Sequence, residues 1–277
     1  QSIVAIQRDY GDRKSRKNAR MKYLLHDKGI NWFKDILVTK YYKKPIKPLR
    51  EEPVNKLIDY LGWQKQNNKK WFVGLPLLSG RLTGEKKLTI RKLVEKYNLD
   101  LRLTPNQDVL ICNISNKNKN EIELELKDIG YENLDDINEI QRHALACPAL
   151  PLCGLAMTEA ERILPDILER IDNLLKSLNI EKTILFRITG CPNGCSRPYM
   201  AELALVGSGL NKYQLWLGGS KNLQRLAKPY LQRMPLENME STLTPLLLEW
   251  RKYYLDLDFG DFVDKNEDSF ILDLLSN

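Results

Sequence analysis

The sequence predicts an α+β protein in which a small open sheet is followed by a second domain that carries most of the cysteines. Two observations lead to this class. Strand and helix patterns follow one another in the order β-α-β-β-α between residues 71 and 132, and an amphipathic segment, 158–179, runs into a short apolar strand at 183–189. Helices and strands mixed without a regular parallel repeat are typical of the α+β class.

The first of these regions has a clear order of elements. Residues 71–82 have the pattern of a strand interrupted by Gly and Pro, 86–99 have apolar residues at helical spacing, 101–114 hold two strands around a Pro-Asn turn, and 119–132 form another helix. This order suits an open sheet with helices on one face, which is the ferredoxin-like sandwich. We expect residues 50–70 to be a connector with one or two helical turns.

The second region begins with the long segment 158–179. Thr158 and Glu161 have the spacing of a capping box, and we expect Pro165 to kink the helix. One apolar stripe marks the face that turns toward the core: Ile163, Ile167, Ile171, Leu174 and Leu178. The rest of the region predicts a strand, a hairpin and a terminal helix, at 183–189, at 203–207 with 213–219, and at 241–257.

The composition describes a chain of ordinary globular character with an excess of positive charge. The 277 residues include 43 Lys and Arg against 36 Asp and Glu, a formal net charge of +7, so an anionic partner would be attracted. Nucleic acid, an acidic protein and a small anion are all partners of this kind. No apolar run is long enough for a membrane span and no signal-peptide pattern is present, which predicts a soluble intracellular protein without a membrane partner. Because the sequence begins with Gln1 instead of Met and opens mid-pattern with "SIVAIQRDYGDRK", we expect it to be part of a longer protein.

Positive charge is concentrated at the amino-terminal end. A solvated basic face is the ordinary explanation of such a run. Its basic residues are Arg8, Arg13, Lys14, Arg16, Lys17, Arg20 and Lys22, against Asp9 and Asp12. Together with the element pattern, this predicts three parts: a basic segment at 1–52, the open-sheet domain at 53–138 and the cysteine-bearing domain at 139–277.

Four of the five cysteines form two tight pairs, which points to a bound inorganic group. Cys147 and Cys153 have five residues between them, and Cys191 and Cys195 have three. Structural zinc favours two to four residues within a pair, and disulfides are rare in reducing compartments. A [4Fe–4S] cluster is larger and accepts thiolates from looser loops, so the spacing favours a cluster while zinc stays open. Cys112, outside the pairs, is expected at a buried strand position.

The loops around the cysteines also suit a bulky inorganic group. Three prolines stiffen the backbone: Pro148, Pro151 and Pro192. Gly190 and Gly194 let the backbone come close to the group, and they leave backbone N–H groups free to bond sulfur.

These motifs resemble a known family. "ACPALPLCGLAMTEAER", followed by "RITGCPNGCSRPYMAELALVG" and "YQLWLGG", is similar to the carboxy-terminal half of the sulfite and nitrite reductases, most of all to the ferredoxin-dependent sulfite reductases of plants and cyanobacteria. The resemblance runs from Gln1 to Phe262. It implies a ferredoxin-like half domain followed by an α/β domain that binds siroheme and a [4Fe–4S] cluster.

The resemblance implies a role for each cysteine of the two pairs. In that family the pairs ligate one [4Fe–4S] cluster, so Cys147, Cys153, Cys191 and Cys195 would be its ligands, and Cys195 would also bridge to the siroheme iron. It further implies siroheme contacts by basic and polar side chains: Arg13, Arg16, Lys17, Arg20, Lys22, Arg102, Asn106, Gln107 and Arg197. The implied reaction is the six-electron reduction of sulfite to sulfide with electrons from ferredoxin, in a bacterial cytoplasm or a plastid stroma.

Two other functions stay open at this point. Nitrite reductases share the cofactors, and the residues that contact the substrate in this family lie upstream of Gln1. A zinc-stabilised nucleic-acid-binding module would use the basic amino-terminal run on phosphates. The absence of recognition motifs within that run and of two-histidine zinc patterns makes nucleic acid an unlikely main partner, because His26 and His143 are isolated.

Overall fold

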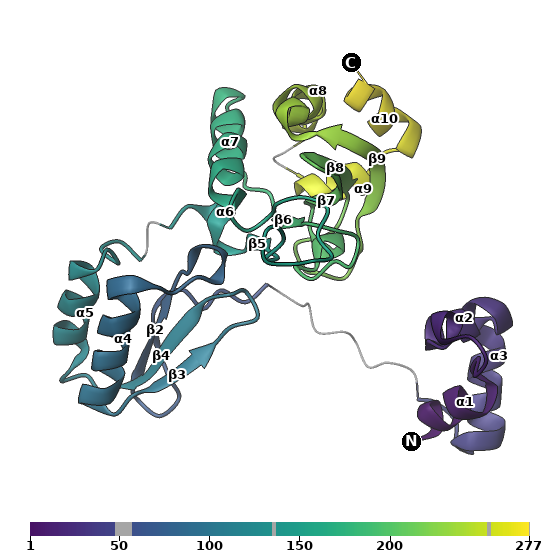
Figure 1. Cartoon of the computed structure of the whole chain (residues 1–277), viewed down its shortest axis with the longest axis horizontal. Coiled ribbons are helices and arrows are strands. Elements are labelled where there is room, and N and C mark those ends of the chain that lie inside the picture. Colours follow the sequence, from purple (N-terminus) through teal and green to yellow (C-terminus); the bar gives the residue numbers. More distant parts are fainter. Residues whose placement is uncertain (48–56, 135–136, 254–255, 277) are drawn as a thin grey trace. The chain divides into compact units, whose positions relative to one another are not determined.

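The computed structural model describes residues 1–47, 57–134, 137–253 and 256–276 (Figure 1). The chain divides into two compact units, residues 1–53 and residues 54–277, and each is described by itself. The first boundary lies within the predicted connector. The second unit contains both sheets, so the predicted border between the open-sheet domain and the cysteine-bearing domain stays a prediction.

The first unit is helical, which the charge run did not reveal. It contains α1 (Ser2–Tyr10), α2 (Met21–Lys28) and α3 (Ile30–Ile36), together with a 3-10 turn and a π-helical turn at Arg16–Asn18 and Leu37–Tyr41. A small core holds the helices together, formed by Ile6, Leu24 and Phe33. The Gln7 side chain closes the unit by donating from Nε2 to the Ala19 carbonyl over 2.7 Å.

The second unit begins with an antiparallel sheet in the order β1-β2-β4-β3. Its strands are β1 (Gly62–Lys65), β2 (Trp71–Leu75), β3 (Asp100–Leu103) and β4 (Val109–Ile114), and its helices are α4 (Gly84–Tyr97) and α5 (Lys119–Asp128). Both helices contribute to one core with the same face of β2 and β4, formed by Val73, Leu75, Ile90, Leu93, Ile111, Ile122 and Leu126. Helices on one face of the sheet were predicted, and this is confirmed; β1 was missed within the expected connector.

A second sheet follows in the order β5-β6-β7-β8-β9. Its strands are β5 (Leu145–Ala146), β6 (Phe186–Thr189), β7 (Leu203–Gly209), β8 (Lys212–Leu217) and β9 (Lys228–Pro235). The first three strands are parallel and the last three are antiparallel neighbours. The predicted hairpin is therefore confirmed as β7 and β8, whereas β9 was not predicted.

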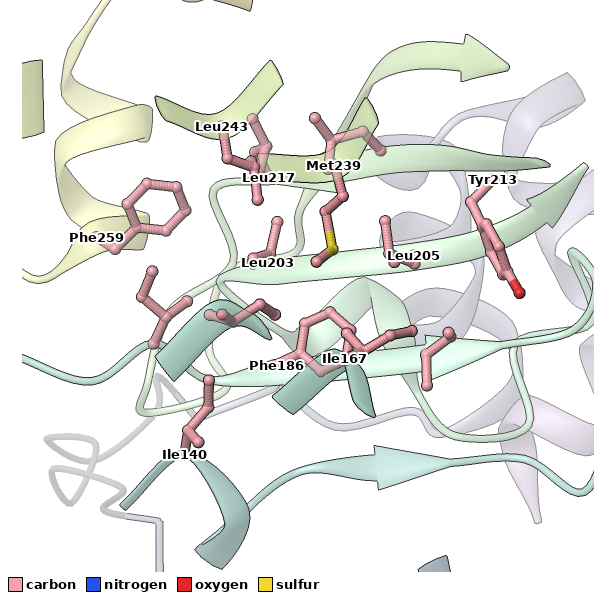
Figure 2. Close-up of a cluster of buried hydrophobic side chains, with 14 of the residues drawn as sticks. Ile140, Ile167, Phe186, Leu203, Leu205, Tyr213, Leu217, Met239, Leu243 and Phe259 are labelled. Atoms are coloured by element: carbon pink, nitrogen blue, oxygen red, sulfur yellow. The ribbon is translucent and has the colours of Figure 1, made fainter. Parts of the chain in front are cut away.

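Five helices accompany this sheet: α6 (Glu139–Arg142), α7 (Leu164–Ser177), α8 (Met239–Arg251), α9 (Phe259–Lys265) and α10 (Asp268–Ser276). Figure 2 shows Phe186, Leu203, Leu205 and Leu217 of the strands gathered with Ile167 of α7 and with Met239 and Leu243 of α8. Because side chains alternate along a strand, Arg187 and Thr189 of β6 lie on the face opposite this core. The helix expected to be terminal is α8, and two more follow it.

The amino-terminal end of α7 differs from the prediction. The helix begins at Leu164, and Pro165 lies in its first turn, where the missing N–H would have no helical partner. Pro165 therefore starts the helix and does not kink it. Thr158 is no cap: its buried Oγ1 donates to the Tyr213 hydroxyl over 3.1 Å and accepts from the Asn211 N–H over 3.1 Å. Within the described ranges, no helix is long and apolar enough to cross a membrane.

Candidate metal centre

The two cysteine pairs follow two neighbouring parallel strands. β5 pairs with β6 in a register that joins Leu145 to Arg187 and Ala146 to Ile188. Cys147 comes directly after β5, and Cys191 comes two residues after the end of β6. Since parallel strands end at the same edge of a sheet, this pairing brings the two cysteine loops together.

Cys147 is held against the second loop by its own sulfur. Its Sγ accepts hydrogen bonds from the Gly190 N–H over 3.2 Å and from the Thr189 hydroxyl over 3.3 Å, and its own N–H donates to the Ile188 carbonyl over 3.3 Å. The side chain is buried. Donors aimed at a sulfur are the arrangement that supports a ligating thiolate.

The first loop folds back onto the second through its backbone. Cys153 donates from its N–H to the Ala149 carbonyl over 2.8 Å, and the peptide bond before Pro151 is cis. Further along, the Met157 N–H donates to the Gly190 carbonyl over 2.8 Å. The carbonyl and the N–H of Gly190 are thus both hydrogen-bonded to the first loop, which keeps the two loops in contact.

Gly190 is required by this contact between loops. A Cβ at this position would lie 2.7 Å from the Ala149 Cβ and 2.8 Å from the Thr158 carbonyl oxygen. Gly194 has a φ of +68°, and a Cβ there would lie 2.7 Å from the Tyr199 ring. We expected these glycines to leave N–H groups free for the sulfurs of the bound group; the Gly190 N–H instead donates to Cys147 Sγ, and the space at the two glycines is filled by the neighbouring loop and by Tyr199.

The four paired cysteines differ in exposure. Cys147 and Cys191 are buried, Cys153 is half-buried and Cys195 is exposed. The fifth, Cys112, is buried in β4 as predicted, and burial raises the pKa of its thiol. Within the part of the chain that the structure describes, no group of three or more His, Cys, Asp or Glu is placed to hold a metal ion.

Two of the predicted site residues link the cysteine loops to the turn between β3 and β4. The Gln107 side chain forms two hydrogen bonds with the backbone of Ala146, and the Arg197 Nη2 donates to the Pro105 carbonyl over 2.7 Å. Asn106 lies in the same turn, where its N–H donates to the Thr104 hydroxyl. Arg102 is exposed on β3.

The predicted basic residues of the amino-terminal segment belong to the other compact unit. Each is exposed: Arg13, Arg16, Lys17, Arg20 and Lys22. Arg13 donates to the Arg8 carbonyl from Nε and Nη2 over 3.3 and 3.2 Å, and the Lys22 Nζ lies 5.0 Å from the centroid of the Tyr23 ring. Their assignment to a cofactor pocket stays a prediction.

Arg187 is a residue of this region that the sequence prediction missed. Its side chain is fully buried in β6, and its Nη1 donates to the Arg197 carbonyl over 3.1 Å. Nε and Nη2 have no hydrogen-bond partner among the described residues. Burial, together with the nearby Arg197 charge, lowers the pKa of Arg187 to about 10. An arginine within the apolar strand "FRIT" was the available signal.

Tyr199 also escaped the sequence prediction. Its hydroxyl donates to the Pro192 carbonyl over 2.7 Å, and its ring centroid lies 4.5 Å from that of Trp216. Tyr199 therefore closes the turn that carries Cys191 and Cys195. Nothing in the local sequence signals this, because Tyr199 lies in the 3-10 turn Pro198–Met200 and Trp216 comes from β8.

The comparisons with known proteins agree with this description. A family model described as the nitrite/sulfite reductase ferredoxin-like half domain matches residues 64–139, and one described as the nitrite and sulphite reductase 4Fe-4S domain matches residues 1–46. The second match contains none of the cysteines. The solved structure of the Mycobacterium tuberculosis NirA protein aligns with a TM-score of 0.77 at 25% identity, covering 98% of this chain and 52% of that one.

Curated relatives extend the similarity over nearly all of the sequence. The "Sulfite reductase [ferredoxin]" of Synechococcus elongatus is 47% identical over 271 residues, which is 96% of this chain and 43% of the relative. The "Sulfite reductase [NADPH] hemoprotein beta-component" of Oceanobacillus iheyensis is 36% identical over 269 residues, or 95% of this chain and 46% of the relative. The chain thus spans less than half the length of these relatives.

The fold and the matches define an α+β protein built around a ferredoxin-like half domain. The chain belongs to the nitrite and sulfite reductase family.

Proposed function

We propose that this chain supplies the cysteine-bearing part of a sulfite reductase, which reduces sulfite to sulfide by six electrons at a siroheme coupled to a [4Fe–4S] cluster. The observation that carries the proposal is the junction of the two cysteine loops at the end of β5 and β6, where Cys147 Sγ accepts two hydrogen bonds. The similarity to curated sulfite reductases over nearly the whole chain supports the same reaction.

The chemistry of the two cysteine loops supports an iron–sulfur cluster as their ligand, although the four thiols are not gathered around one point in the described structure. Four thiols lie on two loops that are bonded to each other through Gly190, so a shared group would have ligands from both sides. The N–H and hydroxyl donors on Cys147 would stabilise a ligating sulfur. Cys147, Cys153, Cys191 and Cys195 would hold the cluster, which would supply single electrons when bound.

Cys195 is the cysteine best suited to bridge to a second group. It is exposed, whereas Cys147 and Cys191 are buried and Cys153 is half-buried, so Cys195 is the most accessible of the four cysteines. We therefore propose that Cys195 would be the cysteine shared between the cluster and the siroheme iron. The side chains of Arg102 and Asn106 are the candidates of this unit for the siroheme carboxylates, since Arg grips a carboxylate through two donors, whereas the Arg197 Nη2 is already bonded to the Pro105 carbonyl. The candidates of the first unit are Arg13, Arg16, Lys17, Arg20 and Lys22.

The proposed electron donor is ferredoxin, in a bacterial cytoplasm or a plastid stroma. The formal charge of +7 would attract an acidic protein. If so, the KM for reduced ferredoxin should rise several-fold between low and physiological ionic strength while the KM for sulfite changes less, because screening weakens contacts between exposed charges. A KM for ferredoxin that is independent of salt would favour a flavoprotein donor over ferredoxin.

Nitrite is the second candidate substrate, because the matching family models cover nitrite and sulfite reductases together. The test is steady-state turnover of both anions by the full-length protein with the same donor. The proposal predicts a higher kcat/KM for sulfite. A higher kcat/KM for nitrite would assign the protein to nitrite reduction with the cofactors unchanged.

A further inference from the structure

The turn between β3 and β4 keeps its shape through its own hydrogen bonds. The Thr104 N–H donates to the Asp108 carbonyl over 2.9 Å, and the Thr104 hydroxyl accepts from the N–H groups of Asn106 and Asp108. The Asp108 carboxylate in turn accepts from the Leu77 N–H over 3.1 Å. We call residues 104–108 the β3–β4 turn. Since these bonds need no bound group, the turn is a rigid element of the protein itself.

Gln107 uses its whole side-chain amide on the first cysteine loop. Its Nε2 donates to the Ala146 carbonyl over 2.9 Å, and its Oε1 accepts from the Ala146 N–H over 3.2 Å. Ala146 is the last residue of β5, an edge strand of two residues, and Cys147 follows it. The Gln107 amide thus satisfies the backbone on the free edge of β5, much as a neighbouring strand would.

Gln107 is held in place to make this contact. Its φ is +69°, a left-handed conformation that costs energy for a residue with a side chain. Gly80 lies against it, so closely that a Cβ on Gly80 would be 3.1 Å from the Gln107 Cβ. A strained backbone and a close neighbour both restrict the direction of the amide.

The same turn also binds the second cysteine loop. The Arg197 Nη2 donates to the Pro105 carbonyl over 2.7 Å, and the Arg197 N–H donates to the Gly194 carbonyl over 2.8 Å. The buried Arg187 fixes the Arg197 carbonyl from the other side over 3.1 Å. Arg197 lies two residues after Cys195, and Ala146 lies one residue before Cys147, so each contact of the turn is next to a cysteine.

We propose that the β3–β4 turn is the positioning element of the metal centre, with Gln107 setting the place of Cys147 and Arg197 setting the place of Cys195. One rigid turn contacts both loops, so it sets their separation before any group binds. This deepens the proposed function and rests on it only for the identity of the group that the loops hold. It also gives Gln107 a role different from the siroheme contact that the family resemblance implied.

The first test uses the full-length protein and follows the Ala146 amide, which reports the contact directly. Gln107→Met keeps the side-chain length and removes both hydrogen bonds, and the Ala146 amide should exchange with deuterium about tenfold faster. Gln66→Met is the matched control, because Gln66 accepts from the backbone N–H of Asn113 on the same sheet, over 2.7 Å, without contact to the cysteine loops. Equal Ala146 protection in all three proteins would overturn the proposal.

The second test uses the cofactor-loaded protein and reads the cluster by spectroscopy. Gln107→Met and Arg197→Met should each shift the EPR g-values of the reduced cluster and lower its content of acid-labile sulfide, whereas Gln66→Met should leave both unchanged. Gln107→Glu, which keeps the acceptor of the Ala146 N–H and loses the donor, should give an intermediate shift. Unchanged g-values and sulfide in the Gln107 and Arg197 variants would contradict the proposal. A parent protein without acid-labile sulfide would instead sink the proposed function and leave the exchange result standing.

Discussion

At the scale of single residues, Gly190 shows how a neighbouring loop determines which residue a position can hold. Its N–H and its carbonyl both bond the loop of Cys147, and no side chain fits between them. The sequence predicted a glycine that makes room for an inorganic group. The structure shows a glycine that lets two cysteine loops touch, which is the condition for four thiols to share one group.

Replacing Gly190 by alanine tests this packing. Gly190→Ala should lower the free energy of unfolding by about 1 to 3 kcal/mol, because its Cβ would be 2.8 Å from the backbone oxygen of Thr158, which cannot rotate away. Gly154→Ala is the matched control in the adjacent loop, since no atom lies within 4 Å of a Cβ there, and it should change stability by less than about 0.5 kcal/mol. Urea unfolding of the apoprotein measures both, and equal losses would contradict the packing argument.

Glu202 is a second residue whose role depends on burial. Its two carboxylate oxygens accept from the Leu185 N–H over 2.8 Å and from the Gly260 N–H over 2.9 Å. Burial raises the pKa of Glu202 to about 7, against the lowering effect of the Lys221 charge. An acid whose pKa is raised on folding contributes stability below its unfolded pKa near 4.5 and loses it as the pH rises toward 7.

Glu202→Gln should therefore flatten the dependence of stability on pH. The parent's free energy of unfolding should include a fall of up to about 1.4 kcal/mol per pH unit between pH 5 and 7 from this group, and the variant should lack that fall. The variant should also be about 1 kcal/mol less stable at pH 5, because an amide accepts only one of the two N–H groups without conflict. Urea unfolding across this pH range measures the slopes, with the exposed Glu237→Gln as control. A variant slope equal to the parent's would refute the assignment.

At the scale of elements, a side-chain ion pair joins the first sheet's domain to the loop before α7. Arg81 forms a two-pronged pair with Glu161, whose side chain is only 11% exposed, and the Ser79 hydroxyl donates to the Glu161 carbonyl over 2.9 Å. The pair lies where the first cysteine loop approaches the β3–β4 turn, since Pro148 of that loop and Gln107 of the turn line the same cavity of about 320 Å³.

Removing this pair should cost more than removing an exposed one. Arg81→Met leaves a largely buried Glu161 carboxylate without its partner, so the loss of unfolding free energy should exceed that of Arg91→Met. Arg91 pairs with Glu95 within α4, and both side chains are more than 60% exposed, which makes it the matched control. Denaturation of both variants decides the point, and equal losses would mean that the Arg81 pair is no more than a surface contact.

The elements that the sequence predicted are those with strong local patterns. α4, β3, β4 and α5 follow from apolar periodicity and a Pro-Asn turn. β1 is a four-residue strand, "GWQK", with no clear alternation, and β9, "KPYLQRMP", contains two prolines and two basic residues, so neither gives a local signal. The helices of the first unit were hidden because their charged residues obscured a short apolar face.

The candidate site was predictable to the same extent. Spacing alone identified the two cysteine pairs, because ligand loops are local motifs. The contact of Gln107 with Ala146 spans 39 positions and the burial of Arg187 depends on the packing of a whole sheet, so neither follows from local pattern. Such long-range contacts need the fold before they can be recognised.

At the scale of the whole molecule, the parallel part of the second sheet explains why the cysteines lie in two distant segments. β5 and β6 are separated along the chain by α7 and are adjacent in the sheet, so their loops meet although 37 residues separate Cys153 from Cys191. The first sheet then contributes the turn that contacts both loops. Both sheets therefore contribute contacts around the two cysteine loops.

The central claim is that the two cysteine loops together hold a [4Fe–4S] cluster, and chemical analysis of the purified full-length protein tests it most directly. We predict about four acid-labile sulfides per chain with matching iron. Cys191→Ser should lose them, and Cys112→Ser, which changes the buried cysteine of β4, should keep them. Stoichiometric zinc without acid-labile sulfide, or a full sulfide content in Cys191→Ser, would contradict the claim.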